Sequence, residues 1–178
     1  MSRVYEGMPQ GIKDKPAPRL SDEGYFDARA TLVVTCVDVV VRNGRGEVLL
    51  CERAHHPQKD WWLVGGRMYK GDELAESAAR NVEREIGLTI NPKRFTYLTS
   101  ANLAWLEDGD KSVRNGVNPG VHTFSLIMMV TISDDEAAAI CLNDEYVEGG
   151  SQWLSLQDIL LGPYHSALHH VANTLLLS

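Results

Sequence analysis

The chain has 178 residues, of which 44% are hydrophobic and 23% charged, and this length and composition favour one globular domain with a buried core. Acidic residues outnumber basic ones by 24 to 17, and the net charge of −7 argues against a general nucleic-acid binder, which needs a basic face. The sequence has no apolar run approaching roughly 18 residues, so we expect neither a nucleic acid nor a membrane as partner.

The cysteines and the first residues bear on the cellular compartment. Cys36 and Cys51 lie in apolar stretches, and without the spacing of a metal site they are expected to be buried free thiols. Residues 1–20 are rich in proline, glycine and charge and are expected to form an N-terminal arm before one domain over 21–178. This stretch has no long apolar run, so we expect a cytoplasmic protein without a secretory signal.

The first part of the domain predicts a helix followed by a β-hairpin. Ser21 precedes two acidic residues and is expected to cap a short helix over 21–29. A β-branched run over 31–41 predicts a buried strand. An Asn-Gly pair then marks a tight turn, and the strand returns over 47–53.

The rest of the chain completes a sandwich of helices and sheet. A helix is expected over 72–86, closed by Gly87, because glycine suits the left-handed residue that ends many helices. The long polar loop over 107–120 is expected to select the ligand, since loops of this length are commonly functional. The other expected elements are strands over 94–106 and 121–132, a short strand ending at Trp153, and a helix over 164–178. This order predicts a mixed sheet flanked by helices, an α/β (α+β) fold.

The helix over 72–86 carries a polar patch beside its apolar stripe. With a turn of about 100° per residue, its apolar side chains share one face, which is expected to be buried: Ala75, Ala79, Val82 and Ile86. Asn81, Arg84 and Glu85 then form one patch along the edge of that stripe. Glu83 points the opposite way and is excluded from this patch.

The spacing of this region resembles the Nudix box, which is written G-x5-E-x7-R-E-U-x-E-E-x-G-U. The matching residues are Gly66, Asp72, Arg80, Val82, Glu85, Gly87 and Leu88. The resemblance implies a Nudix-like α/β/α sandwich that cleaves nucleoside diphosphates linked to another group, with Mg²⁺ (or Mn²⁺) as cofactor. It also implies structural roles for Asp72, Arg80 and Gly87, the acid and the arginine forming a pair that locks the loop to the helix.

The sequence departs from the box at three positions. Asp72 replaces a glutamate, whereas Asn81 and Arg84 replace two metal-binding glutamates. Glu85 therefore remains as the one acid of the metal-facing patch, and with the Gly66 carbonyl it is expected to hold at most one Mg²⁺. The positive charge of Arg84 discourages a second cation, and its guanidinium is expected to bind phosphate.

One branch of the family, the GDP-mannose mannosyl hydrolases, resembles this altered pattern. That likeness implies cleavage of a sugar C–O bond in a GDP-mannose-like nucleotide sugar, and it favours a homodimer. It also implies that the substrate contacts Arg53, Arg67 and His122, and that Arg67 and His122 stabilise the leaving group. Trp61 and Trp62 are expected to be core or dimer contacts rather than groups that stack on a base.

The general base is left open between two acids. The offset from Trp153 puts Val147 and Glu148 where the branch has a glutamine near the metal and a histidine base. Glu148 is the expected base, and Glu145 is the rival. Two other functions also remain open, a Nudix enzyme that cleaves the P–O bond of a nucleoside diphosphate and a Nudix domain that binds a nucleotide without catalysis.

Overall fold

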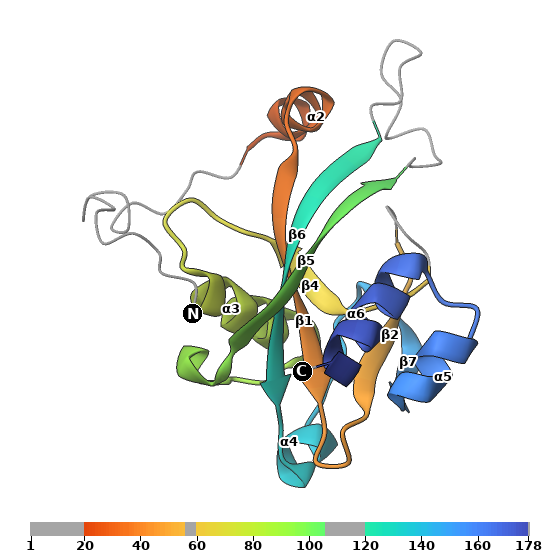
Figure 1. Cartoon of the computed structure of the whole chain (residues 1–178). Coiled ribbons are helices and arrows are strands. Elements are labelled where there is room, and N and C mark those ends of the chain that lie inside the picture. The colour runs from red at the N-terminus through yellow and green to blue at the C-terminus, as the bar shows by residue number, and fades with distance from the viewer. Residues whose placement is uncertain (1–19, 56–59, 106–119, 178) are drawn as a thin grey trace.

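The computed structural model describes residues 20–55, 60–105 and 120–177 of the chain. Figure 1 shows a central twisted sheet with helices on both of its faces. The strands are β1 (Val34–Arg42), β2 (Val48–Arg53), β3 (Trp61–Trp62), β4 (Val64–Arg67), β5 (Thr96–Trp105), β6 (Val121–Thr131) and β7 (Tyr146–Leu154). The helices are α2 (Asp22–Thr31), α3 (Leu74–Ile86), α4 (Asp134–Ala138), α5 (Leu156–Leu161), α6 (Ser166–Leu177) and the 3₁₀ turn η1 (Pro92–Arg94).

The strands form one mixed seven-stranded sheet. Its main path runs β3-β2-β1-β6-β5, with β4 paired to β1 and β7 paired to β2. Strands β1 and β6 are parallel, in register from Val34 opposite Thr123 to Arg42 opposite Thr131. The remaining pairs are antiparallel. The predicted mixed sheet is therefore confirmed.

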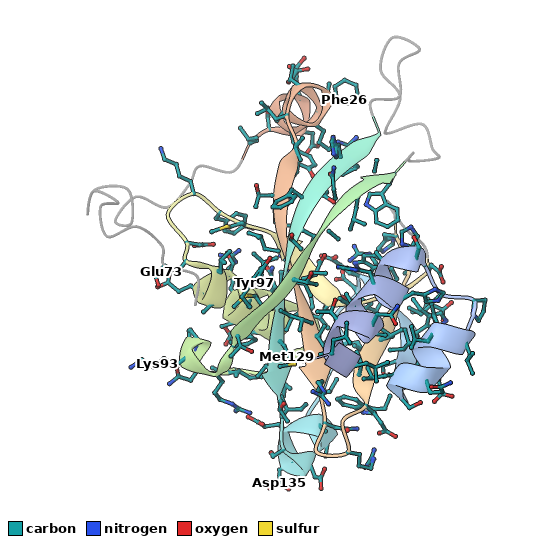
Figure 2. All side chains as sticks on the ribbon, viewed as in Figure 1. Phe26, Glu73, Lys93, Tyr97, Met129 and Asp135 are labelled. Atoms are coloured by element: carbon teal, nitrogen blue, oxygen red, sulfur yellow. The ribbon has the colours of Figure 1, made fainter. Side chains whose placement is uncertain are left out.

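Strand β1 divides the core into two layers, because successive side chains of a strand point to opposite faces. Val37, Val39 and Val41 pack in the layer that holds α3. Val40 packs in the other layer, with the apolar side chains of α5 and α6. Figure 2 shows Met129 of β6 beside α6 in this second layer. Helices on both faces of the sheet confirm the predicted α/β/α sandwich.

Helix α3 begins and ends through defined caps. Glu73 and Glu76 form a reciprocal capping box at its start, so the helix begins after residue 73 rather than at 72. Gly87 has a φ of 72° and ends the helix as predicted. The buried face is more polar than expected, and it consists of Ser77, Ala78, Asn81, Val82, Glu85 and Ile86. Ala75 and Ala79 pack against the core as predicted but are only partly buried.

Helix α2 confirms the helix predicted after Ser21. The Ser21 hydroxyl oxygen accepts a hydrogen bond from the Gly24 amide at 3.1 Å. Apart from Leu20 and Gly120, the expected arm over 1–20 and the loop over 107–120 lie outside the described residues. No helix within the described ranges has the length and apolar character needed to cross a lipid bilayer.

Candidate functional site: an arginine-rich cavity beside strand β1

A cavity of about 310 Å³ lies along the first half of β1. Its volume lies at the lower end of the range typical for small-molecule sites. Its walls hold four arginines, three aromatic rings and two carboxylates: Arg29, Arg53, Arg67, Arg84, Tyr25, Trp62, Trp105, Asp38 and Glu145. Guanidinium groups bind phosphate, and aromatic rings bind flat or sugar rings. The cavity therefore suits an anionic ligand that also carries rings.

Arg53 and Glu145 form an ion pair in the cavity wall. Nη2 of Arg53 lies 3.2 Å from Oε2 of Glu145. The Arg53 side chain is 16% exposed, and its guanidinium also lies 5.9 Å from the centre of the Tyr146 ring. Nε of Arg53 is buried without a hydrogen-bond acceptor in the described part of the chain. Arg53 is therefore an incompletely paired group of the cavity wall.

Arg67 connects three elements at the end of β4. Its guanidinium lies 4.2 Å from the centre of the Tyr25 ring of α2, within the range of a cation–π contact. Its carbonyl oxygen accepts a hydrogen bond from Nη2 of Arg80 at 3.0 Å. Both Arg53 and Arg67, predicted as substrate contacts, therefore lie in the cavity wall.

Asp72 and Arg80 hold the turn before α3 against the helix. Their side chains form an ion pair, and Oδ2 of Asp72 also accepts from the Ser77 hydroxyl at 2.8 Å and from the Tyr69 amide at 3.2 Å. Arg80 thereby joins Asp72 to the Arg67 carbonyl. Neither residue lines the cavity, so both act on its shape through Arg67.

Asp38 is a buried cavity residue that the sequence interpretation missed. Burial raises the pKa of its carboxyl group to about 6, although a hydrogen bond from the Ser125 hydroxyl acts in the opposite direction. Nearby Glu85 raises this pKa further. The signal available in the sequence was a single acid within the β-branched run 31–41, two residues from Cys36 and therefore on the same face of the strand.

Two predicted site residues lie away from the cavity. Val121 and Thr123 of β6 line it, so His122 between them points to the opposite face of the sheet, where its Nε2 lies 2.6 Å from Oδ1 of Asn102. Glu148 lines a separate depression on β7. Of the two candidate bases, Glu145 is the one in the cavity wall.

Trp62 belongs to both the core and the cavity wall. It is 8% exposed and packs in the layer of α5 and α6, as expected for a core residue. Its ring meets Trp105 edge-on at 5.3 Å between centroids, and His165 lies 4.9 Å from Trp105. The expectation that Trp62 is a core residue is confirmed, and Trp62 and Trp105 also line the cavity.

Glu85, the predicted metal ligand, already has a partner for each carboxylate oxygen. Its side chain is fully buried. Oε2 accepts from the Gly65 amide at 2.9 Å and from the Tyr146 hydroxyl, while Oε1 forms an ion pair with Nη2 of Arg84. Burial and neighbouring Glu85 raise the pKa of Tyr146, so its hydroxyl stays protonated and donates. Glu85 is thus held by three groups of the protein itself.

The side chain of Asn81 donates a hydrogen bond to the second predicted metal donor, the Gly66 carbonyl. Its Nδ2 donates to Gly66 at 3.2 Å and to the Val37 carbonyl at 3.0 Å. Oδ1 of Asn81 is enclosed, without a hydrogen-bond partner in the described residues, and Asn81 is not part of the cavity wall.

These donors do not fit a divalent cation. Mg²⁺ prefers an octahedron of free oxygen ligands, whereas here the one carboxylate is neutralised by a guanidinium and the carbonyl is already an acceptor. Among the described residues no group of three His, Cys, Asp or Glu side chains is arranged to hold a metal ion.

Comparison with known proteins identifies relatives of this chain. A family model described as the NUDIX domain matches residues 33–174. The low-salt glycan biosynthesis protein Agl8 of Haloferax volcanii is 31% identical over 125 residues, which cover 68% of this chain and 74% of that protein. The MutT protein from Methanosarcina mazei Go1 has a similar structure, with a TM-score of 0.60, 20% identity, and coverage of 79% of this chain and 91% of that one.

A second solved structure shares the fold. The NUDIX domain of Shewanella oneidensis NrtR, complexed with ADP ribose, has a TM-score of 0.58 and 16% identity, covering 83% of this chain and 88% of that one. At these identities the two solved structures establish the fold alone.

Proposed function

Because the chain belongs to the NUDIX domain family, we propose that it is a hydrolase of a nucleoside diphosphate sugar. The observation that carries this proposal is the cavity in which four arginines lie together with Trp62 and Trp105. A nucleotide sugar presents two negative charges between two ring systems, which matches guanidinium groups beside aromatic rings. The Haloferax relative is named for glycan biosynthesis, and this supports a sugar-bearing substrate.

The proposed reaction breaks the bond between the anomeric carbon and the diphosphate oxygen. Glu145 accepts a proton from a water molecule, whose oxygen bonds to the anomeric carbon while the nucleoside diphosphate leaves with the bonding electrons. Arg53, Arg67 and Arg84 stabilise the negative charge of the leaving diphosphate. The products are a free sugar and a nucleoside diphosphate.

The family generally uses a divalent metal such as Mg²⁺. The Mg²⁺ (or Mn²⁺) predicted at Glu85 and Gly66 is an untested prediction, and the contacts of Arg84 and Asn81 with these two donors argue against it. The proposed steps therefore use the side chains of the cavity alone.

A second candidate is a nucleotide-binding module without catalysis. It is favoured by the ion pair between Arg84 and Glu85, because Arg84 neutralises the one acid that remains from the family's metal site. In that case the arginines bind the diphosphate tightly, and no bond is broken.

The test is a panel of nucleoside diphosphate sugars incubated with the full chain in ¹⁸O-water and assayed by mass spectrometry. Label in the released sugar supports the proposed C–O cleavage. Label in phosphate assigns P–O cleavage instead, and binding by calorimetry without any product supports the module. The matched control is Arg45→Ala, which removes a charge from an exposed ion pair with Glu47 and should leave every result unchanged.

A further inference from the structure

The side chains that replace two of the family's glutamates contact the two predicted metal donors. Arg84 contacts the Glu85 carboxylate, and the amide of Asn81 donates to the Gly66 carbonyl. Each substituted side chain therefore takes an oxygen that a cation would otherwise need. These two contacts give the oxygens of Glu85 and Gly66 protein partners in place of a metal ion.

The guanidinium of Arg84 fills the space beside the glycine turn. Its Nη2 donates to the Gly65 carbonyl at 3.0 Å and also contacts Glu85. A Cβ atom placed on Gly66 would lie 2.5 Å from the same nitrogen, which shows how closely the guanidinium approaches that backbone. The positive charge thus lies between a backbone carbonyl and a carboxylate, a position that suits a bound cation.

Displacing this guanidinium would be costly. Glu85 is fully buried, and a buried carboxylate that loses its partner is strongly destabilising. A guanidinium stays charged at any working pH, and here it lies against the Glu85 carboxylate. A divalent ion would have to compete with a charge that is covalently tethered and always present.

Arg84 also keeps hydrogen-bond donors for a ligand. Its hydrogen bonds to described residues use Nη2, so the N–H groups on Nη1 and Nε remain for an anion. The side chain is 38% exposed and forms part of the cavity wall beside Arg53 and Arg67. One nitrogen of the guanidinium therefore meets Glu85, and the other two make no hydrogen bond to described residues.

We infer that Arg84 is the built-in cation of this site, and that the cavity binds the diphosphate of its ligand without a divalent metal. The identity of the anion as a diphosphate rests on the proposed function, whereas the displacement of the metal from Glu85 does not. Glu85 then positions Arg84, and Asn81 holds the glycine turn that the guanidinium approaches.

Manganese binding to the full chain without nucleotide tests the displacement, measured by electron paramagnetic resonance. Wild type is expected to bind no Mn²⁺ at Glu85 at millimolar concentrations, whereas Arg84→Glu is expected to bind one ion. The double variant Arg84→Glu/Glu85→Gln should lose that ion. A wild-type Mn²⁺ site that Glu85→Gln removes would overturn the inference, as would an Arg84→Glu variant that binds none.

A second variant covers the case in which Arg84→Glu does not fold. Arg84→Met keeps the apolar stem and removes the charge, so Mn²⁺ should raise its Tm but leave the Tm of wild type unchanged. Arg45→Met, at an exposed ion pair, is the matched control and should behave as wild type. Equal Mn²⁺ responses of wild type and Arg84→Met would contradict a role for Arg84 as the resident cation.

Inorganic pyrophosphate tests the second part of the inference, that the cavity binds a diphosphate without a divalent metal. Wild type should bind it in EDTA buffer without any added Mg²⁺, and Arg84→Met should weaken this affinity by roughly 10-fold or more. Binding that needs added Mg²⁺, or no binding with or without it, overturns that part. A failure to turn over nucleotide sugars would instead count against the proposed function and leave the Mn²⁺ result standing.

Discussion

The guanidinium of Arg53 and the carboxylate of Glu145 lie 3.2 Å apart, and this ion pair joins the end of β2 to the loop before β7. Tyr146, the next residue along, pairs directly with Arg53 in the sheet. The sheet register therefore places Glu145, rather than Glu148, against the arginines that line the cavity.

Replacement of Glu145 tests its role as general base. Glu145→Gln should lower kcat for the nucleotide sugar by about 10²–10⁴-fold, because an amide of nearly the same shape cannot accept the proton from water. The Kd of the substrate should change much less. Glu148→Gln is the matched control and should leave kcat unchanged. A large loss of kcat in Glu148→Gln with little loss in Glu145→Gln would show that Glu148 is the base.

Removal of Arg67 tests the anion-binding role of the cavity. Arg67→Ala should weaken nucleotide-sugar binding by roughly 10- to 100-fold, since a hydrogen bond to a charged group contributes about 1.5–3 kcal/mol. Calorimetry at fixed ionic strength measures the change. Arg45→Ala removes the same charge from an exposed ion pair outside the cavity, and an equal loss there would point to long-range charge rather than contact.

Asp38 predicts a pH dependence of stability. Burial raises its pKa to about 6 from 3.8, so the folded protein holds this proton more tightly than the unfolded chain does. The resulting stabilisation is complete below about pH 4 and is lost as the pH rises through about 6. At about 1.4 kcal/mol per pKa unit, the loss is up to about 3 kcal/mol.

Urea unfolding from pH 4 to pH 8 measures this effect against Asp38→Asn. The free energy of unfolding of wild type should fall relative to the variant over this range, because an amide does not ionise. A constant difference between the two proteins across the range would show that Asp38 has an ordinary pKa in the folded state.

Gly65 is expected to tolerate no side chain. A Cβ atom there would lie 2.0 Å from Oδ1 and 2.8 Å from the Cα of Asp38, and a backbone atom cannot move aside cheaply. Gly65→Ala should therefore destabilise the protein by about 1–3 kcal/mol, the usual range for an overpacked interior. Gly44→Ala is the control, since its Cβ would meet nothing within 4 Å, and its Tm should stay near that of wild type. Equal Tm values for both variants would refute the close approach.

The elements that sequence predicted well are those whose signals are local. The serine before α2, the Asn-Gly turn after β1 and the glycine after α3 each act through the conformation of a few neighbouring residues. The pairing of Asp72 with Arg80 is similar, because one turn and one helix bring both residues together. Such features need no knowledge of the distant parts of the chain.

The buried face of α3 was harder to predict because its polar residues are satisfied by distant strands. Asn81 donates to the Val37 carbonyl of β1, and Glu85 accepts from the Gly65 amide of β4. Hydrophobic periodicity assigns such side chains to the edge of the buried stripe, since it takes no account of partners from other elements. Glu145 was ranked below Glu148 for a related reason, since the register of β7 on β2 depends on pairing far along the sequence.

Helix α2 lies before the matched region 33–174, yet it supplies Tyr25 and Arg29 to the cavity wall. The contact of Tyr25 with Arg67 links it to β4, and Arg80 extends that link to α3. A fragment trimmed to the family boundaries would retain both core layers but expose one side of the cavity to water. Under the proposed function, removal of α2 should therefore weaken nucleotide-sugar binding, although α2 lies outside the family boundaries.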